Sequence, residues 1–216
     1  EMQVTRPEIL LAADPTVILP AAPAQVIDGL MERLGLDPRR KYIAFTLRPW
    51  PGFEEKAALF GAAADYAYET YGLTPVFLPI EPRLDVQSAR LAARHMKAPC
   101  HVLEETGGSD HTIGLLSRMQ VVVSMRLHAL VFAAGQGVPL VGVVYDQKIS
   151  SFLSYIGQDL FTELEQVTLP ILQSHIDAAC ARIGDTEFLS SGVERLRQVE
   201  RRNQEAARRL LEHSKQ

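Results

Sequence analysis

The sequence predicts an α/β fold with a Rossmann-like parallel sheet and helices on both faces. Strand-like and helix-like segments alternate about every thirty residues along most of the chain. The strand-like segments are continuously apolar and lack strict alternation, which is typical of parallel strands buried on both faces. Residues 121–130 show the pattern best, because a β-branched run stops at Arg126 and His128 and then resumes at helical spacing.

Six apolar segments are predicted as strands. They are residues 9–13, 42–50, 74–80, 100–103, 121–123 and 139–146. The first ends at the turn residues Asp14 and Pro15, and the second carries Arg48 at its end, where Pro49 forces an extended exit. The last ends on Asp146, and further along the chain the strand signal fades.

Eight segments with apolar residues at helical spacing are predicted as helices. They are residues 26–34, 54–71, 85–96, 113–117, 127–134, 149–156, 169–183 and 193–213. Gly35, Gly72 and Gly157 close three of them at the usual carboxyl-terminal cap, and Asp85 is a candidate N-cap. We expect one domain over residues 1–187, followed over 188–216 by an amphipathic helix that packs on it or on another domain.

Composition and charge limit the function. With 216 residues, 47% of them hydrophobic, the chain can bury a full core. A net charge of −4 argues against a nucleic-acid partner bound through a broad basic face. Cys100 and Cys180 have no ligand spacing around them, so neither a disulfide framework nor a zinc site is predicted. Neither a bilayer-spanning apolar run nor a signal segment is seen, which predicts a soluble, cytoplasmic protein.

Arg126 and His128 are the strongest candidate site residues, because they interrupt a junction that is otherwise apolar. Beyond the carboxyl end of a parallel strand, where a helix begins, an arginine and a histidine predict a carboxylate or phosphate ligand. The histidine could act as a general acid or base, or only as a donor to an anion. In the alternative interpretation, Arg126 pairs with a carboxylate and His128 caps a helix.

Other charged side chains are predicted at the same edge of the sheet. Lys148 follows the next strand and would be a third cation facing the crevice, although a solvated surface charge is the alternative. Asp146 either orients His128 or Lys148, or caps the following helix. Arg48 ends an earlier strand, where the alternative is an ordinary salt bridge at the edge of the sheet.

Ser124 and Asp110 are candidate supporting residues. Ser124 precedes Arg126 but lies in no recognisable nucleophile motif. Asp110 belongs to the polar, glycine-containing segment 104–111, which matches no phosphate-cradle pattern and is predicted to be a flexible loop over the site. Asp110 and the adjacent His111 have no third ligand nearby in the sequence, so no metal site is predicted.

Three motifs carry a resemblance to a known family. Residues 124–130 (SMRLHAL), then 137–139 (GVP) and 145–149 (YDQKI), closely resemble the polysaccharide pyruvyl transferase family. More narrowly, they look like the CsaB-type branch, which pyruvylates secondary cell-wall polysaccharide. Residues 12–15 and 46–48 support this resemblance.

The resemblance implies a reaction and a set of roles. Enzymes of this family resemble two-domain GT-B glycosyltransferases and transfer a group from phosphoenolpyruvate onto a sugar as a cyclic ketal. The implied acceptor is a lipid-linked saccharide containing N-acetylmannosamine, whose product anchors S-layer proteins, and no metal or nucleotide cofactor is implied. His128 would be the general acid or phosphate-stabilising donor, and Lys148 a catalytic residue. Arg126 and Lys148 would clamp the anion, together with Arg48.

The resemblance covers only the carboxyl-terminal half of the family's longer chains. We therefore expect the C-terminal domain of a GT-B-type enzyme, inactive without its amino-terminal domain and located in the cytoplasm or at the inner face of the membrane. Two alternatives stay open. One is a GT-B glycosyltransferase or sugar-nucleotide epimerase that uses the same cations on a diphosphate, and the other is a non-catalytic binding module. The charged face of the last helix could also contact a membrane surface, and a solvated face is the alternative.

Overall fold

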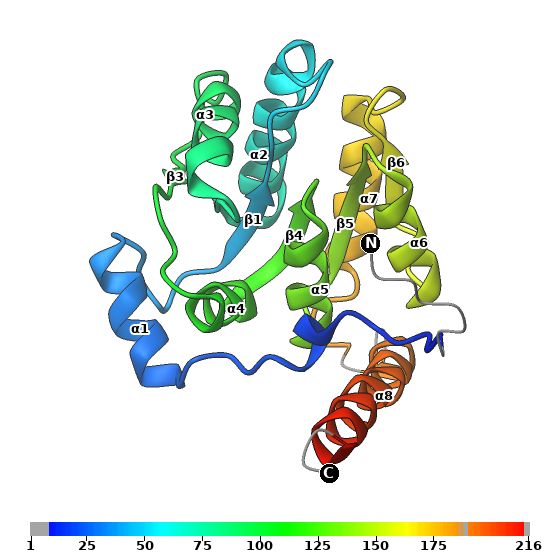
Figure 1. The fold of residues 1–216 in the computed structure, drawn as a ribbon. Coiled ribbons are helices and arrows are strands. Elements are labelled where there is room, and N and C mark those ends of the chain that lie inside the picture. Colours follow the sequence, from blue (N-terminus) through cyan, green and yellow to red (C-terminus); the bar gives the residue numbers. More distant parts are fainter. Residues whose placement is uncertain (1–8, 186, 188–189, 214–216) are drawn as a thin grey trace.

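The computed structural model describes residues 9–185, 187 and 190–213 and places one six-stranded sheet at its centre (Figure 1). The strands are β1 (Tyr42–Thr46), β2 (Thr74–Phe77), β3 (His101–Val102), β4 (Met119–Ser124), β5 (Leu140–Val144) and β6 (Phe161–Glu163). All neighbouring strands run parallel, in the order β3-β2-β1-β4-β5-β6. This order is that of a doubly wound fold, so the predicted Rossmann-like sheet is confirmed.

Helices cover both faces of the sheet. They are η1 (Pro15–Ile18), α1 (Ala24–Arg33), η2 (Glu54–Lys56), α2 (Ala57–Tyr71), α3 (Pro82–Ala93), α4 (Ser109–Ser117), α5 (Leu127–Gly135), α6 (Gln147–Tyr155), α7 (Leu169–Cys180) and α8 (Ser190–His213). Helices α1, α4, α5 and α6 pack with Tyr42 and Ala44 of β1 on one face, whereas α2, α3 and α7 pack with Ile43 and Phe45 on the other. Both faces of the central strands are therefore buried, which explains why those strands read as continuous apolar runs.

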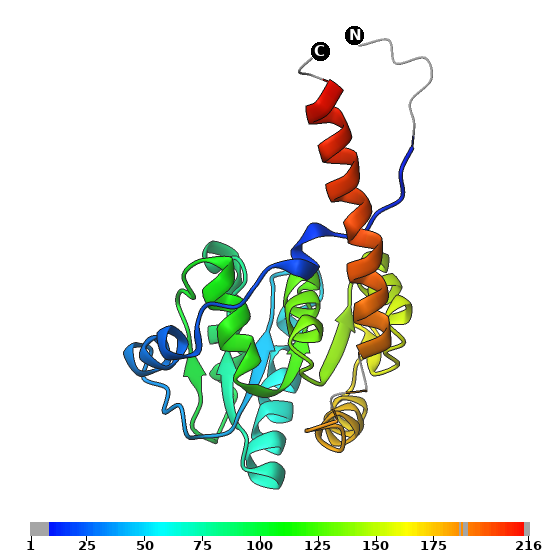
Figure 2. The same ribbon diagram turned by 90° about the horizontal axis from the view of Figure 1, so that it is seen from below.

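The predicted strand over residues 9–13 is wrong. Ile9 and Leu11 are 88% and 79% exposed, and the segment has no strand next to it. It runs beside α8 instead, where the carbonyl oxygens of Leu11 and Ala13 accept hydrogen bonds from Arg202 and Asn203 (Figure 2). An apolar run forms a strand only where a neighbour supplies hydrogen bonds, and β1 already has a neighbour on each side.

The structure differs from the sequence predictions at three further elements. The short edge strand β6 was not predicted, because its residues are polar in part and only half-buried. Helix α3 begins at Pro82 with Glu81 as its N-cap, so Asp85 lies in the first turn and is not the cap. Helix α4 begins at Ser109, so the predicted loop over 104–111 ends earlier and Asp110 is helical.

Helix α8 packs on the fold from its start to about Asn203. Val193 is buried in the core next to α6, and Asn203 contacts the segment before η1, whereas Leu210 is 73% exposed where the helix projects outward (Figure 2). The predicted domain boundary between residues 187 and 188 lies beside residues 188 and 189, which are outside the described residues. Within the described part of the chain, no helix is both long and apolar enough to cross a bilayer.

Both cysteines are half-buried free thiols. Burial raises the pKa of the Cys180 thiol to about 11, with a smaller contribution from the Asp177 carboxylate. Burial also raises the pKa of Cys100, and Asp65 adds to that effect. Both side chains are therefore protonated near neutral pH, which is typical of cysteines without a chemical role.

Candidate active site

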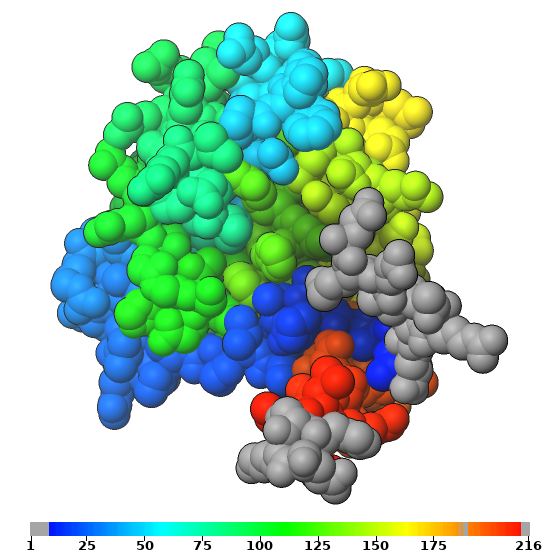
Figure 3. All heavy atoms as spheres, in the orientation of Figure 1, coloured from blue at the N-terminus to red at the C-terminus, as the bar shows by residue number. Residues whose placement is uncertain are grey.

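The junction between β4 and α5 lies where the topology of the sheet reverses. β1 and β4 are neighbours, but the chain continues from β1 to β2 on one side and from β4 to β5 on the other. Ligands of open α/β sheets bind beyond the carboxyl ends of the strands at such a point. Figure 3 shows a hollow at this edge, with the residues after β4 (green) in its floor, η1 (blue) on one side and α3 (teal) on another.

Ser124 fixes the backbone at this junction. The last residues of β1 and β4, Thr46 and Ser124, are paired in register and fully buried, and their hydroxyl groups are hydrogen-bonded to each other. The Ser124 oxygen also accepts a hydrogen bond from the Arg126 N–H at 2.8 Å and donates one to the Arg126 carbonyl oxygen at 2.9 Å. Ser124 thus orients the turn that places Arg126 at the N-cap of α5 and His128 in its first turn.

Arg126 is paired with a buried carboxylate, which is the alternative that the sequence left open. Its Nε atom lies 3.0 Å from each carboxylate oxygen of Asp85, and its Nη2 atom donates to the same group. The Arg126 and Asp85 side chains are only 14% and 1% exposed. Among the described residues, Nη1 has no hydrogen-bond partner, so this nitrogen and the free N–H groups at the start of α5 are the donors left for an anion.

His128 lies in the first turn of α5 with its side chain 49% exposed. Its Nε2 atom is 3.4 Å from the Asp14 carboxylate, and its ring stacks on Phe132 one helical turn later. Partial burial acts to raise the pKa of Asp14, but hydrogen bonds from Thr16 and the nearby His128 outweigh it and lower that pKa. Asp14 is therefore an anion near neutral pH and can accept a hydrogen bond from the imidazole.

A pocket of about 240 Å³ adjoins His128. Its lining residues come from η1, from the loops after β2 and β3, and from α3, α4 and α5. They are Thr16, Ile80, Pro82, Thr106, Gly107, Ser109, Thr112, His128 and Phe132. The hydroxyl groups of Thr106 and Thr112 are buried and lie 2.8 Å apart. Asp110 is exposed in the first turn of α4 and does not line this pocket.

Arg48 belongs to a second cluster, at the ends of β1 and β5. Its guanidinium carbon lies 4.7 Å from the centre of the Tyr145 ring and 5.2 Å from that of Trp50, and Nη1 donates to the Tyr145 hydroxyl. The Trp50 and Tyr145 rings are 4.4 Å apart. Sequence reasoning assigned no role to Trp50 or Tyr145. The signal was present, since the single tryptophan of the chain follows the strand-end arginine by two residues.

Lys148 and Asp146 lie next to this cluster. The Lys148 ammonium is 5.9 Å from the Tyr145 ring centre and 3.6 Å from the Asp146 carboxylate. Asp146 is the N-cap of α6 and accepts a hydrogen bond from the Lys148 N–H at 2.9 Å, so the capping interpretation is the one the geometry supports. No contact joins Lys148 to His128 among the described residues, so the two predicted catalytic side chains lie on neighbouring strand ends without touching.

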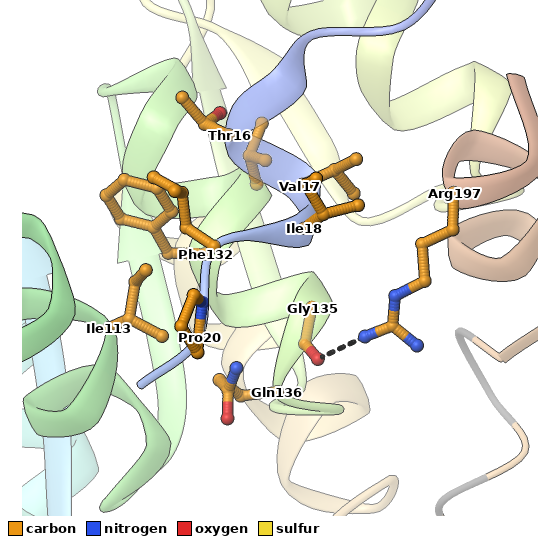
Figure 4. A pocket seen from close by; sticks show the side chains of 11 residues that line it. Thr16, Val17, Ile18, Pro20, Ile113, Phe132, Gly135, Gln136 and Arg197 are labelled. Atoms are coloured by element: carbon orange, nitrogen blue, oxygen red, sulfur yellow. Dashed lines mark hydrogen bonds between the residues drawn. The ribbon is translucent and has the colours of Figure 1, made fainter. Parts of the chain in front are cut away.

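A pocket of about 280 Å³ lies at the other end of α5 (Figure 4). Val17, Ile18 and Phe132 line it, and Arg197 of α8 donates to the Gly135 carbonyl oxygen at 3.2 Å. Its lining includes Thr16, Gln136 and Arg197 but none of the strand-end cations Arg48, Arg126 and Lys148. Over the same described ranges, no group of three acidic, histidine or cysteine side chains could hold a metal ion.

Solved structures with a similar fold include a glycosyltransferase. The chain aligns with a family 9 glycosyl transferase from Veillonella parvula at a TM-score of 0.51, with 14% identity, 76% of this chain and 53% of the other covered. A trehalose-phosphate synthase from Burkholderia vietnamiensis aligns at a TM-score of 0.52 with 14% identity, and the alignment covers 89% of this chain and 52% of the other. The C-terminal CMP-Kdo binding domain of WaaA from Acinetobacter baumannii aligns at a TM-score of 0.51 with 15% identity, and the alignment covers 81% of this chain and 97% of the other. The fold is thus GT-B-like, and the chain spans about half the length of the first two proteins.

The sequence comparisons give the family. A search of curated protein sequences found no match to the chain. The profile of the polysaccharide pyruvyl transferase family matches residues 2–147, a span that includes Arg48, Arg126 and His128 and stops one residue before Lys148. Because this match covers well over half of the sequence, the chain belongs to the polysaccharide pyruvyl transferase family.

Proposed function

We propose that the carboxyl edge of the sheet binds phosphoenolpyruvate, and that the enzyme transfers its pyruvyl group onto a sugar as a cyclic ketal. The observation that carries this proposal is the β4–α5 junction, where Arg126 and His128 meet a helix amino terminus beside a pocket. In the reaction, two sugar hydroxyls bond to the enol carbon and phosphate leaves. Of their two protons, one goes to the methylene carbon and the other to the phosphate.

The hydrogen-bond donors at this edge of the sheet suit the two anionic groups of phosphoenolpyruvate. Phosphoenolpyruvate carries a carboxylate and a phosphate, and charge-assisted hydrogen bonds to such groups are stronger than neutral ones. Arg126 offers Nη1, and the first turn of α5 offers free N–H groups where the helix dipole favours an anion. Arg48 and Lys148 add positive charge from the neighbouring strand ends. In this proposal Arg126, Arg48 and Lys148 bind the donor, and the reaction needs no metal or nucleotide cofactor.

His128 is proposed as the acid of this reaction. A half-exposed imidazole next to an ionised Asp14 can donate a proton to the leaving phosphate or to the methylene carbon. It can also stabilise negative charge on the phosphate without giving up the proton. Lys148, on the next strand end, is the second proposed catalytic group.

The finer identity of the enzyme is also a proposal. We propose that it belongs to the CsaB-type branch, that its acceptor is a lipid-linked saccharide containing N-acetylmannosamine, and that it acts in the cytoplasm at the inner face of the membrane. The motifs at 124–130 and 145–149 support this assignment. We further propose that a second domain forms the other wall of the cleft, since the chain spans only about half of two glycosyltransferases with this fold.

A transfer assay with phosphoenolpyruvate and a synthetic N-acetylmannosamine acceptor tests this function. We expect ketal formation by an enzyme that contains both domains, a loss of about a hundredfold or more on His128→Gln, and no turnover by residues 1–216 alone. Full activity of the His128→Gln enzyme would remove His128 from the mechanism. The fold of the neighbours favours one competing function, a glycosyltransferase. Transfer from a nucleotide sugar without any response to phosphoenolpyruvate would establish that function instead.

A further inference from the structure

Trp50 is a large aromatic side chain that the fold leaves 39% exposed at the edge that carries the site. It lies four residues beyond β1, and Tyr145 is the first residue beyond β5. Both of these strands are neighbours of β4, whose end carries Arg126 and His128. The two rings, 4.4 Å apart and inclined by 46°, form a surface at this edge that we call the aromatic platform, made of Trp50 and Tyr145.

The aromatic platform is held in place before any ligand arrives. Arg48 lies over both rings and donates to the Tyr145 hydroxyl, so cation–π contacts fix their relative position. The Trp50 carbonyl oxygen accepts a hydrogen bond from the N–H of Phe53 at 2.9 Å, and the Phe53 ring is buried in the core. A rigid, partly exposed ring binds a ligand with little loss of conformational freedom.

The chemistry of this surface fits a sugar ring better than phosphoenolpyruvate. The face of an aromatic ring carries negative charge density, so it attracts C–H groups and cations and repels anions. One face of a pyranose ring presents C–H groups, and its edge presents hydroxyls. Here the Tyr145 hydroxyl, the Arg48 guanidinium and the Lys148 ammonium surround the rings and can bond to that edge.

We propose that the aromatic platform binds the acceptor saccharide, with a pyranose ring stacked on Trp50. This inference rests on the proposed function, in which phosphoenolpyruvate occupies the β4–α5 junction. Arg48 then lies between the two substrates, where it can contact the donor carboxylate while holding the rings that carry the acceptor. Trp50 and Tyr145 are acceptor-binding residues in this arrangement, not catalytic ones.

Fluorescence tests the proposal directly, because Trp50 is the only tryptophan of the chain. We expect an N-acetylmannosamine-containing disaccharide to change the Trp50 emission in a saturable way, with or without phosphoenolpyruvate present. By calorimetry, Trp50→Ala should weaken disaccharide binding by about tenfold or more and leave phosphoenolpyruvate binding within about twofold. Trp50→Phe should restore most of the disaccharide affinity.

Tyr155→Ala is the matched control. Tyr155 is also 39% exposed and lies under an arginine, Arg195, but it is at the far end of α6 from Lys148. This variant should bind the disaccharide like the unchanged chain. Equal losses of disaccharide affinity in Tyr155→Ala and Trp50→Ala would overturn the proposal, because the loss would then not depend on the aromatic platform.

The outcomes separate this inference from the proposed function. If phosphoenolpyruvate binds but the disaccharide neither binds nor changes the emission, the aromatic platform is not the acceptor site and the proposed function stands. If Trp50→Ala loses phosphoenolpyruvate binding alone, the rings belong to the donor site and the inference is wrong. If the disaccharide binds at Trp50 and phosphoenolpyruvate does not bind at all, the inference stands and the proposed donor is wrong.

Discussion

The Asp85 carboxylate is buried and has four donors around it. The backbone N–H groups of Ile80 and Glu81 donate to it at 3.0 and 2.9 Å, and Nε and Nη2 of Arg126 supply the other two. A buried ion pair of this kind stabilises only as a pair, because removing one partner leaves an uncompensated charge. Asp85 therefore positions Arg126, whose Nη1 atom has no hydrogen-bond partner among the described residues.

The variant Asp85→Ala tests this residue-scale argument. We expect it to lower the free energy of unfolding by about 3–5 kcal/mol, measured by urea denaturation. The control is Asp110→Ala, an exposed acid in the first turn of α4, which should cost less than about 1 kcal/mol. Similar small losses in both variants would mean that the Asp85–Arg126 pair does not organise this edge.

At the scale of single residues, the sequence predicted the positions of the site residues but not all of their partners. The positions of Arg126, His128, Arg48 and Lys148 at strand ends followed from the apolar runs before them. The partner of Arg126 did not, because Asp85 lies 41 residues away in the chain and only the packing of α3 brings it close. Whether a strand-end cation faces a ligand or a carboxylate depends on such contacts between distant elements.

At the scale of elements, Gly107 controls the loop between β3 and α4. Its φ angle of +83° lies in the left-handed region, and a Cβ atom there would approach Nδ1 of His111 to 2.6 Å. Gly107→Ala should therefore destabilise the protein by about 1–2 kcal/mol in thermal or urea unfolding. Gly135→Ala is the control, since a Cβ at Gly135 meets nothing closer than 3.9 Å. An equal effect of the two variants would contradict the role of Gly107.

The elements that sequence patterns predicted correctly are those with two buried faces or one clear apolar stripe. β1, β4 and β5 are of the first kind, and burial on both faces explains their long apolar runs. The edge strand β6 carries no such run, and it forms because β5 offers a free edge. Residues 9–13 form an apolar run but have no neighbouring strand. Pairing partners are a property of the whole sheet, which local patterns do not contain.

At the scale of the whole molecule, two half-buried histidines make stability depend on pH. Burial lowers the pKa of His101 below its usual 6.5, and the charge of Arg40 lowers it further. Burial also lowers the pKa of His175, although a hydrogen bond with Phe161 and the charge of Asp159 oppose it. As pH falls through 6.5, the unfolded chain binds protons before the folded one, so stability decreases.

We therefore expect the urea midpoint to fall between about pH 7 and pH 5, before any acidic group contributes. Folding lowers the pKa of Asp14 below its ordinary value of 3.8. Its contribution to the free energy of unfolding is therefore complete above pH 3.8 and is lost only as the pH falls below that value. Replacing both histidines, His101→Gln with His175→Gln, should flatten the dependence in the upper window. If the urea midpoint of the double variant still falls over this pH range, the pH dependence arises from other groups.

The central claim is that the β4–α5 junction binds phosphoenolpyruvate, and calorimetric titration of the folded chain tests it most directly. We predict saturable binding that His128→Gln weakens by about tenfold or more, while His95→Gln, an exposed histidine after the end of α3, binds like the unchanged chain. Equal affinity of the His128→Gln chain, or binding of a nucleotide sugar with no response to phosphoenolpyruvate, would contradict the account.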